Sequence, residues 1–172
     1  TDTIYGMGCD IFHARAVERV CQYKKIDPKK ANLSFICYDL SHIAEYAKVN
    51  NDVFKLMKKN LPGPFTFILN ATSNLPKLFR NKKTVGIRVP DNNVIREIVR
   101  TLGNPILSTS VRDDNDDVLE YYTDPGLMDE KLSHFVDCVI NSGYGSLEPS
   151  TVVDCTGDEP VIVRQGKGIL EY

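Results

Sequence analysis

The sequence predicts one α/β domain of mixed α+β order, in which a single twisted, mixed β-sheet is flanked by helices. The chain has 172 residues, which is enough for one hydrophobic core and short for two domains. Helical and strand-like patterns alternate along the early part of the chain. Near its end, strand-like runs follow one another with little between them. We therefore treat residues 1–172 as one domain.

The first half of the chain predicts a strand, a helix and a second strand before two further helices. Thr1 to Gly8 is a threonine-rich stretch that runs into a glycine turn, which favours a strand. Ser41 and Asn51 are residue types that cap helix N-termini, and the Pro-Gly-Pro sequence at 62–64 ends a helix. The elements expected after the opening strand are a helix over 14–24, a strand over 33–38, helices over 42–48 and 52–59, and a strand over 65–69.

The second half begins with the same alternation and ends in strands. Asn93 is expected to cap a helix that Gly103 stops, and Asp124 with Pro125 has the pattern of a cap followed by a first-turn proline. The expected elements are a strand over 84–89, a helix over 94–102, a strand over 105–110, a helix over 125–134, and strands over 136–140, 151–155 and 161–164.

The net charge of −2 gives no general reason to bind nucleic acid, because such binding depends largely on neutralising phosphates with Lys and Arg. Local charge clusters exist, and each is first interpreted as solvated surface. Two are basic and one is acidic: Lys24, Lys25, Lys29 and Lys30; Arg80, Lys82 and Lys83; Asp113, Asp114, Asp116, Asp117 and Glu120.

The cysteines and the hydropathy pattern predict a cytoplasmic protein. The five cysteines are widely spaced and form no C-x-x-C pair, so we expect reduced, mostly buried thiols rather than disulfides or a zinc site. No apolar run approaches the roughly 20 residues of a membrane helix. Because the chain begins inside what looks like a functional motif, we expect upstream residues of the domain to be missing. A monomer with no membrane association is the expected state.

The familiar catalytic motifs are missing from the sequence. It contains no G-x-x-x-x-G-K-[ST], G-x-G-x-x-G, H-E-x-x-H or G-x-S-x-G pattern, so we expect no side-chain nucleophile, general base or bound metal of those types. Hydroxyl and basic residues instead gather at the ends of the expected strands, where α/β sheets place ligands. They are Thr1, Thr3, Tyr5, Lys24, Thr66, Arg88, Ser108, Thr109, Ser110, Ser150, Thr151 and Arg164.

These residue types suit the binding of phosphates and carboxylates better than acid–base chemistry. Arg88 is the strongest candidate for anion binding, because strand alternation places it on the face opposite its apolar neighbours Ile87 and Val89. A structural interpretation remains for each residue: threonine is common in strands, a strand arginine can be paired at the surface, and Lys24 lies at a solvated helix end.

Five segments, in order, resemble the YrdC/YciO family. The first, Thr1 to Gly8, matches the family's P-T-[DE]-T-[VI]-Y-G-[LM]-G without its leading proline. The other four resemble W-P-G-P-x-T, V-A-V-R-x-P, S-T-V-V-D and L-R-x-G, and lie at 61–66, 85–90, 150–154 and 163–166. Each motif alone is weak, but the ordered set spans nearly the whole chain and is specific.

The resemblance implies a twisted mixed sheet around a deep, positively charged cleft. It also implies an enzyme of the threonylcarbamoyl-AMP synthase type, a nucleotidyltransferase. Such an enzyme condenses L-threonine, bicarbonate and ATP to threonylcarbamoyl-AMP and pyrophosphate, a step in forming threonylcarbamoyladenosine in tRNA, with Mg²⁺ expected alongside ATP. The protein then holds two anions in line rather than supplying a nucleophile.

Carried over by motif position, the resemblance implies a role for eight residues. Arg88 would clamp the threonine carboxylate with Thr1 beside it, and Tyr5 would line the cleft. Lys24 and Arg164 would meet the triphosphate. Ser110, Ser150 and Thr151 would offer hydroxyls, with Ser150 on the threonine or carbamate side and the other two on the nucleotide side.

Three departures from the family pattern indicate the YciO branch. The family's K-x-R is here Lys24-Lys25-Ile26, and its S-A-N is Ser110-Val111-Arg112. The histidine of the following strand corresponds to Cys37. These changes favour a second hypothesis, a double-stranded RNA, tRNA or nucleotide binder of the same fold with little synthase activity. A third is an interaction module with a vestigial pocket.

Overall fold

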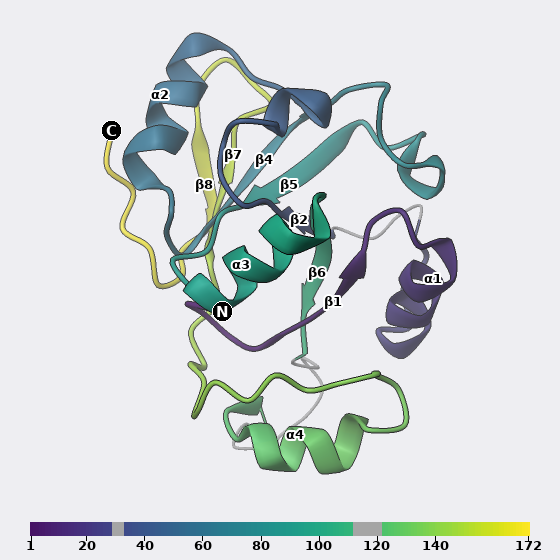
Figure 1. Cartoon of the computed structure of the whole chain (residues 1–172). Coiled ribbons are helices and arrows are strands. Elements are labelled where there is room, and N and C mark those ends of the chain that lie inside the picture. The colour runs from purple at the N-terminus through teal and green to yellow at the C-terminus, as the bar shows by residue number, and fades with distance from the viewer. Residues whose placement is uncertain (29–32, 112–121) are drawn as a thin grey trace.

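One mixed sheet organises the described part of the chain, which comprises residues 1–28, 33–111 and 122–172 of a computed structural model. Within these residues eight strands join in the order β1-β6-β2-β5-β4-β7-β8, and β3 pairs with β4 off this path. The pairs β2–β5 and β4–β7 are parallel and the others antiparallel. Figure 1 shows α1 at the β1 edge, β8 at the opposite edge and α3 across the sheet between them. The predicted α/β class is confirmed.

The strands are β1 (Gly6–Asp10), β2 (Ser34–Ile36), β3 (Ala47–Lys48), β4 (Phe65–Ala71), β5 (Thr84–Arg88), β6 (Ile106–Ser110), β7 (Thr151–Asp154) and β8 (Val161–Arg164). The helices are α1 (Ala14–Tyr23), α2 (Asn51–Asn60), α3 (Asn93–Leu102) and α4 (Pro125–Leu132), with 3₁₀ turns at Ile43–Glu45 and Lys77–Phe79. None of the described helices is both long and apolar enough to cross a membrane.

The apolar face of the sheet carries the larger core. Its central row crosses five neighbouring strands at matched register and is at most 2% exposed; it consists of Val153, Phe67, Ile87, Phe35 and Leu107. Buried residues of α1 and α2, among them Val17 and Met57, belong to the same core. Successive side chains of a strand alternate between the two faces, so the sequence neighbours of the row residues point to the opposite, polar face.

The polar face of the sheet is defined by those alternate residues, which include Thr66, Gly86, Arg88, Ser34 and Ser108. Gly86 lies opposite Ser34, and Ser34 lies opposite Ser108, so hydroxyl groups and a glycine line up across three strands. One end of this face is apolar, because Ile36 and Ile106 pack there under Val99 of α3. The polar face is therefore closed by α3 at one end and lined by small polar residues beyond it.

Helix boundaries follow capping chemistry, with two shifts from the sequence expectation. The caps are Asn50 and Asn92, one residue before the expected Asn51 and Asn93. Their side chains accept hydrogen bonds from Val53 N at 2.8 Å and Ile95 N at 3.1 Å. Gly103 ends α3 in the left-handed region at φ 83°, as expected from its lack of a Cβ. Asp124 caps α4 with Pro125 at the first position.

Three sequence expectations were wrong. The region 42–48 is a 3₁₀ turn and the short strand β3 rather than a helix, because Ala47 pairs with Ala71 and the ring of Tyr46 packs on Phe35. The region 136–140 forms no strand; the N–H of Val136 bonds to Leu132 O as a continuation of the turn after α4. The opening strand begins at Gly6, because residues 1–5 are irregular and the chain bends at Thr3 and Ile4.

Several charged residues discussed above lie outside the described residues. They are Lys29, Lys30, Arg112, Asp113, Asp114, Asp116, Asp117 and Glu120. The cysteine expectation can be followed for all five positions, which are free thiols. Cys21, Cys37 and Cys155 are buried, Cys9 is half-buried and Cys138 is exposed.

Candidate functional site

Arg88 lies at the end of β5 and points to the polar face. Strand alternation places it between Ile87 and Val89, which are 0% and 1% exposed on the apolar face. The residue itself is only 8% exposed. The sequence expectation that Arg88 and its neighbours occupy opposite faces is confirmed.

The guanidinium of Arg88 is only partly satisfied. Its Nη2 donates to Thr3 Oγ1 at 2.9 Å and lies 3.5 Å from Asp2 Oδ1, with which it forms an ion pair. Its Nε is buried and has no hydrogen-bond partner among residues 1–28, 33–111 and 122–172. A buried donor without an acceptor is costly, so an unpaired N–H of this kind marks a position where a ligand acceptor would be stabilised.

Burial lowers the pKa of Arg88, and this is the largest influence on it. Asp2 acts in the opposite direction, and the positive charge of Arg164 lowers the pKa further. A guanidinium stays protonated in proteins, so the lowered pKa means that a charged group is held where charge is unfavourable. A carboxylate or phosphate beside Arg88 would relieve that cost.

A second group of polar atoms surrounds Ser150, just before β7. The hydroxyls of Ser150 and Thr66 are 2.8 Å apart, and Ser150 is 6% exposed. Arg164 of β8 donates through Nη2 to Ser150 O at 2.8 Å and to Ser150 Oγ at 3.2 Å, and through Nε to Ser150 O at 3.2 Å. The structure therefore brings Ser150 and Arg164 together, as members of one hydrogen-bonded group with Thr66.

Thr151 has a structural environment. It is 0% exposed, and its hydroxyl donates to Gly168 O at 2.6 Å and accepts from Gly166 N at 3.0 Å. Gln165 Nε2 also lies 3.3 Å from this oxygen. The hydroxyl thus fixes the turn that follows β8, and a nucleotide contact by Thr151 would need this turn to change.

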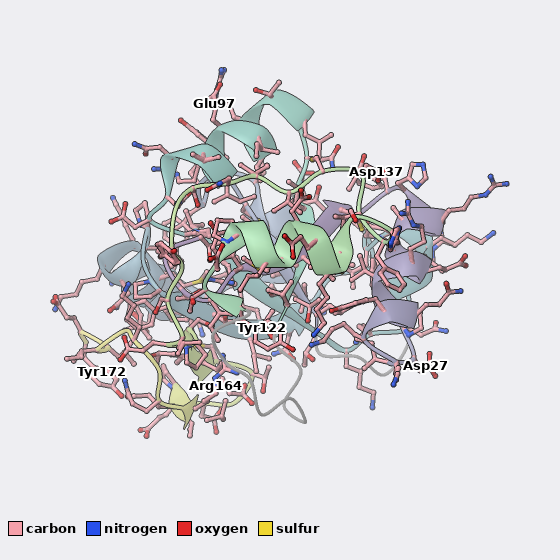
Figure 2. The ribbon with its side chains drawn as sticks, turned by 90° about the horizontal axis from the view of Figure 1, so that it is seen from below. Asp27, Glu97, Tyr122, Asp137, Arg164 and Tyr172 are labelled. Carbon is pink, nitrogen blue, oxygen red and sulfur yellow. The ribbon has the colours of Figure 1, made fainter. Side chains whose placement is uncertain are left out.

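The residues that the sequence assigns to nucleotide binding are spread across the sheet. Ser110 ends β6 and is exposed, opposite Gly6 of β1. Lys24 follows α1 as its C-terminal cap residue and is half-buried. Arg164 lies on β8, at the end of the strand order opposite β1, against which α1 packs. Figure 2 shows Arg164 and Asp27 well apart. Lys24 and Arg164 are therefore not brought together.

Tyr5 holds a loop instead of presenting a free hydroxyl. Its Oη donates to Gly143 O at 2.6 Å and accepts from Ser142 N at 3.2 Å. A Cβ on Gly145 would lie 2.5 Å from the Tyr5 ring, so only glycine allows this approach. Tyr5 and Thr1 also line a largely apolar cavity of about 330 Å³ beside β1, bounded by α1, α3, α4 and the segment after α4.

The expected place of Thr1 beside Arg88 is taken by Thr3. Thr1 Oγ1 donates to Ile4 O at 3.0 Å and lies 3.3 Å from Thr3 Oγ1. Thr1 is therefore linked to the guanidinium through Thr3. The reason is that the chain bends at Thr3 and Ile4 instead of continuing as a strand. Sequence reasoning also missed Asp2 as the acid that pairs with Arg88. The only signal was an acid between two threonines at the start of the motif.

These features define an α/β domain with a buried arginine on the polar face of a mixed sheet as its candidate anion site. Comparison with known proteins places it more narrowly. The family model for Sua5, YciO and YrdC proteins, described as Telomere recombination, matches residues 1–166. The chain belongs to the Sua5/YciO/YrdC family.

Named relatives fall into two groups. The chain is 40% identical over 170 residues to YciO of Escherichia coli, covering 98% of this chain and 81% of that protein. The crystal structure of E. coli YciO superposes with a TM-score of 0.87, covering 98% of this chain and 82% of that one. A protein of Pseudoalteromonas translucida named threonylcarbamoyl-AMP synthase is 26% identical over 159 residues, covering 90% of this chain and 83% of that protein.

A solved relative contains a ligand. The structure of P. abyssi Sua5 complexed with L-threonine is 25% identical and has a TM-score of 0.84. The similarity covers 96% of this chain and 48% of that one. L-Threonine is therefore a ligand of at least one protein that shares this fold.

Proposed function

We propose that this chain binds L-threonine and ATP on the polar face and condenses them with bicarbonate to threonylcarbamoyl-AMP and pyrophosphate, for modification of tRNA. The observation that carries the proposal is the buried guanidinium of Arg88, whose Nε has no acceptor among the described residues. Two relatives support it: the P. abyssi Sua5 structure holds L-threonine, and the P. translucida relative is named as the synthase.

Arg88 would bind the threonine carboxylate. Guanidinium and carboxylate match geometrically, because two parallel N–H donors meet two oxygens. The Nε of Arg88 supplies one donor that is not yet used. Thr3 and Asp2 already hold Nη2, so the guanidinium is oriented before the ligand arrives.

The reaction needs positioned charge rather than a protein nucleophile. The amino group of threonine takes up bicarbonate to give a carbamate, with loss of water. A carbamate oxygen then attacks the α-phosphorus of ATP, and the bond to the β-phosphate oxygen breaks to release pyrophosphate. The Ser150 hydroxyl, with Thr66, would contact the carbamate, while Arg164 would stabilise negative charge on the phosphates.

The remaining nucleotide contacts are assigned to Lys24, Ser110 and Thr151. Of these, Ser110 is exposed on the strand beside β1, whereas the Thr151 hydroxyl is engaged with Gly166 and Gly168. Mg²⁺ would enter with ATP, held mainly by phosphate and water, and would neutralise phosphate charge. The side chains of the polar face would then bind and orient the two substrates.

The direct test is pyrophosphate release from ATP that depends on both L-threonine and bicarbonate. Wild-type protein should show this dependence, and Arg88→Ala should lose it through an increased threonine KM. Arg100→Ala is the matched control, because Arg100 pairs with Glu97 on the exposed side of α3. Release that is independent of threonine and bicarbonate, or an Arg88→Ala variant that keeps wild-type kinetics, would contradict the proposal.

A second function has one specific observation in its favour. Ile26 stands where the family motif has a second cation, and it packs against the apolar core. Loss of that cation favours a binder of double-stranded RNA, tRNA or nucleotide with little synthase activity. Filter binding of tRNA and duplex RNA across a salt series tests it, and no affinity at about 100 mM salt would exclude it.

A further inference from the structure

The carboxylate of Asp2 is the acid beside the guanidinium of Arg88. Asp2 and Arg88 have side chains that are 9% and 10% exposed, so both charges are largely removed from water. Burying one charge without the other is strongly unfavourable, and the pair is therefore coupled energetically. Asp2 raises the pKa of Arg88 against the lowering effect of burial, which fits the same coupling.

Asp2 is itself held by groups on two other segments. Its Oδ2 accepts from the backbone N–H of Asp91 at 2.9 Å, in the turn between β5 and α3. Its backbone carbonyl accepts from Lys167 Nζ at 2.8 Å, beyond β8. The Asp2 carboxylate therefore has one oxygen fixed by the main chain and the other directed at Arg88.

The division of contacts on Arg88 leaves one side of the guanidinium for a ligand. Both contacts from the opening segment, Asp2 and Thr3, are made to Nη2. The Nε has no acceptor within the described residues and is buried. With Nη2 engaged by both contacts, Nε is the buried donor of this guanidinium that remains for a ligand acceptor.

We infer that Asp2 is a positioning residue, which fixes the guanidinium of Arg88 so that its Nε is presented to the substrate carboxylate. The inference rests on the proposed function for the identity of that carboxylate. Asp2 contacts no substrate atom in this role and acts through Arg88. Its loss should therefore weaken binding of the amino acid more than it slows the chemical step.

Asp2→Asn is the sharpest variant. The amide oxygen can still accept from Asp91 N, so the turn keeps its hydrogen bond. The amide nitrogen then faces Arg88 Nη2, and two donors meet where a carboxylate and a donor met before. The substitution is nearly isosteric. It replaces the attraction between Asp2 and Arg88 by repulsion between two donors, and it keeps the hydrogen bond to Asp91 in the turn after β5.

Two measurements separate this inference from the proposed function. The first needs no substrate and follows the ¹⁵N-resolved Nε–Hε signal of Arg88, which is assigned by its absence in Arg88→Lys. The Hε proton should exchange with solvent about tenfold faster in Asp2→Asn than in wild type, which corresponds to about 1.4 kcal/mol. The second is L-threonine binding by calorimetry, where Asp2→Asn should raise the Kd about tenfold while kcat at saturating threonine stays near wild type.

Glu97→Gln is the matched control, because it removes a carboxylate from an arginine pair that lies on the exposed side of α3. It should change neither measurement. Unchanged Nε–Hε exchange in Asp2→Asn overturns the inference whether or not the protein binds threonine. Faster exchange with undiminished threonine binding also overturns it. Wild-type protein that binds no threonine contradicts the proposed function, while the exchange measurement still decides the role of Asp2. Should Asp2→Asn fail to fold, Asp2→Ser carries the same test.

Discussion

The two faces of the sheet differ in what their side chains do for the protein. On the apolar face, Phe67 and Ile87 pack at 0% exposure in a row that crosses five strands. On the polar face, their sequence neighbours Thr66 and Arg88 carry a hydroxyl bonded to Ser150 and a guanidinium with an unused donor in the described structure. The same strands thus carry the packed core on one side and the candidate anion site on the other. Buried polar groups stabilise less than packed apolar groups, so mutations on the two faces should separate stability from binding.

The largest effect is expected from Phe67→Ala on the apolar face. Removing a fully buried aromatic ring should lower the free energy of unfolding by about 3–5 kcal/mol, because burial is lost and a cavity remains. Denaturant unfolding measures it. A loss below about 1 kcal/mol would show that the row is not the centre of the core.

A pH dependence of about 2 kcal/mol should come from Cys37 in the same core. Burial raises the pKa of its thiol to about 12, whereas an unfolded thiol titrates near about 8.5. The folded state therefore keeps the proton above pH 8.5 while the unfolded state releases it. The stabilising contribution is complete below that pH and is progressively lost as the pH rises toward the folded pKa. By about pH 10 the loss should reach about 2 kcal/mol.

Unfolding free energies from pH 8 to 10 test the Cys37 prediction through their slope. Cys37→Ala should flatten the slope, although it also lowers stability at every pH by removing buried atoms. The control is Cys138→Ser, because Cys138 is exposed, and it should leave the slope unchanged. Equal slopes in wild type and Cys37→Ala would contradict the assignment.

The smallest effect on stability is expected from Thr66→Val on the polar face. Valine keeps the shape and removes the hydroxyl 2.8 Å from Ser150 Oγ, which should cost about 1 kcal/mol in unfolding. Threonine- and bicarbonate-dependent pyrophosphate release should fall much more in relative terms. The reverse result, a large loss of stability with full activity, would show that the Thr66 and Ser150 pair stabilises the fold. It would contradict the assignment of the polar face to substrate binding.

Much of the fold followed from local patterns. Helices α1 to α4 and strands β4 to β8 lie within a few residues of their predicted positions, because capping residues, glycine and β-branched runs act locally. Region 42–48 failed because its conformation depends on distant partners, the pairing with Ala71 and the packing on Phe35. Region 136–140 has strand-forming residues but no strand partner in the described structure.

The site was predictable in part for a similar reason. Alternation alone placed Arg88 opposite Ile87, and the motif resemblance pointed to Ser150 and Arg164, which the fold brings into contact. The contact of Arg88 with Thr3 rather than Thr1 depends on a bend that no periodicity reveals. The same holds for Asp2, whose partner is 86 residues away in sequence.

The long sequence separation between Asp2 and Arg88 affects when the site forms during folding. Strand β1 pairs with β6 about 100 residues later, and β4 pairs with β7 across more than 80 residues. Long-range pairings of this kind are slow to close, because chain entropy is lost before contacts compensate for it. The hydrogen bond between Thr3 and Arg88 joins residues that are 85 positions apart and is a long-range contact of the same kind. We therefore expect the contact between Thr3 and Arg88 to be among the late contacts of folding, which late protection of the Arg88 guanidinium from hydrogen exchange during refolding would show.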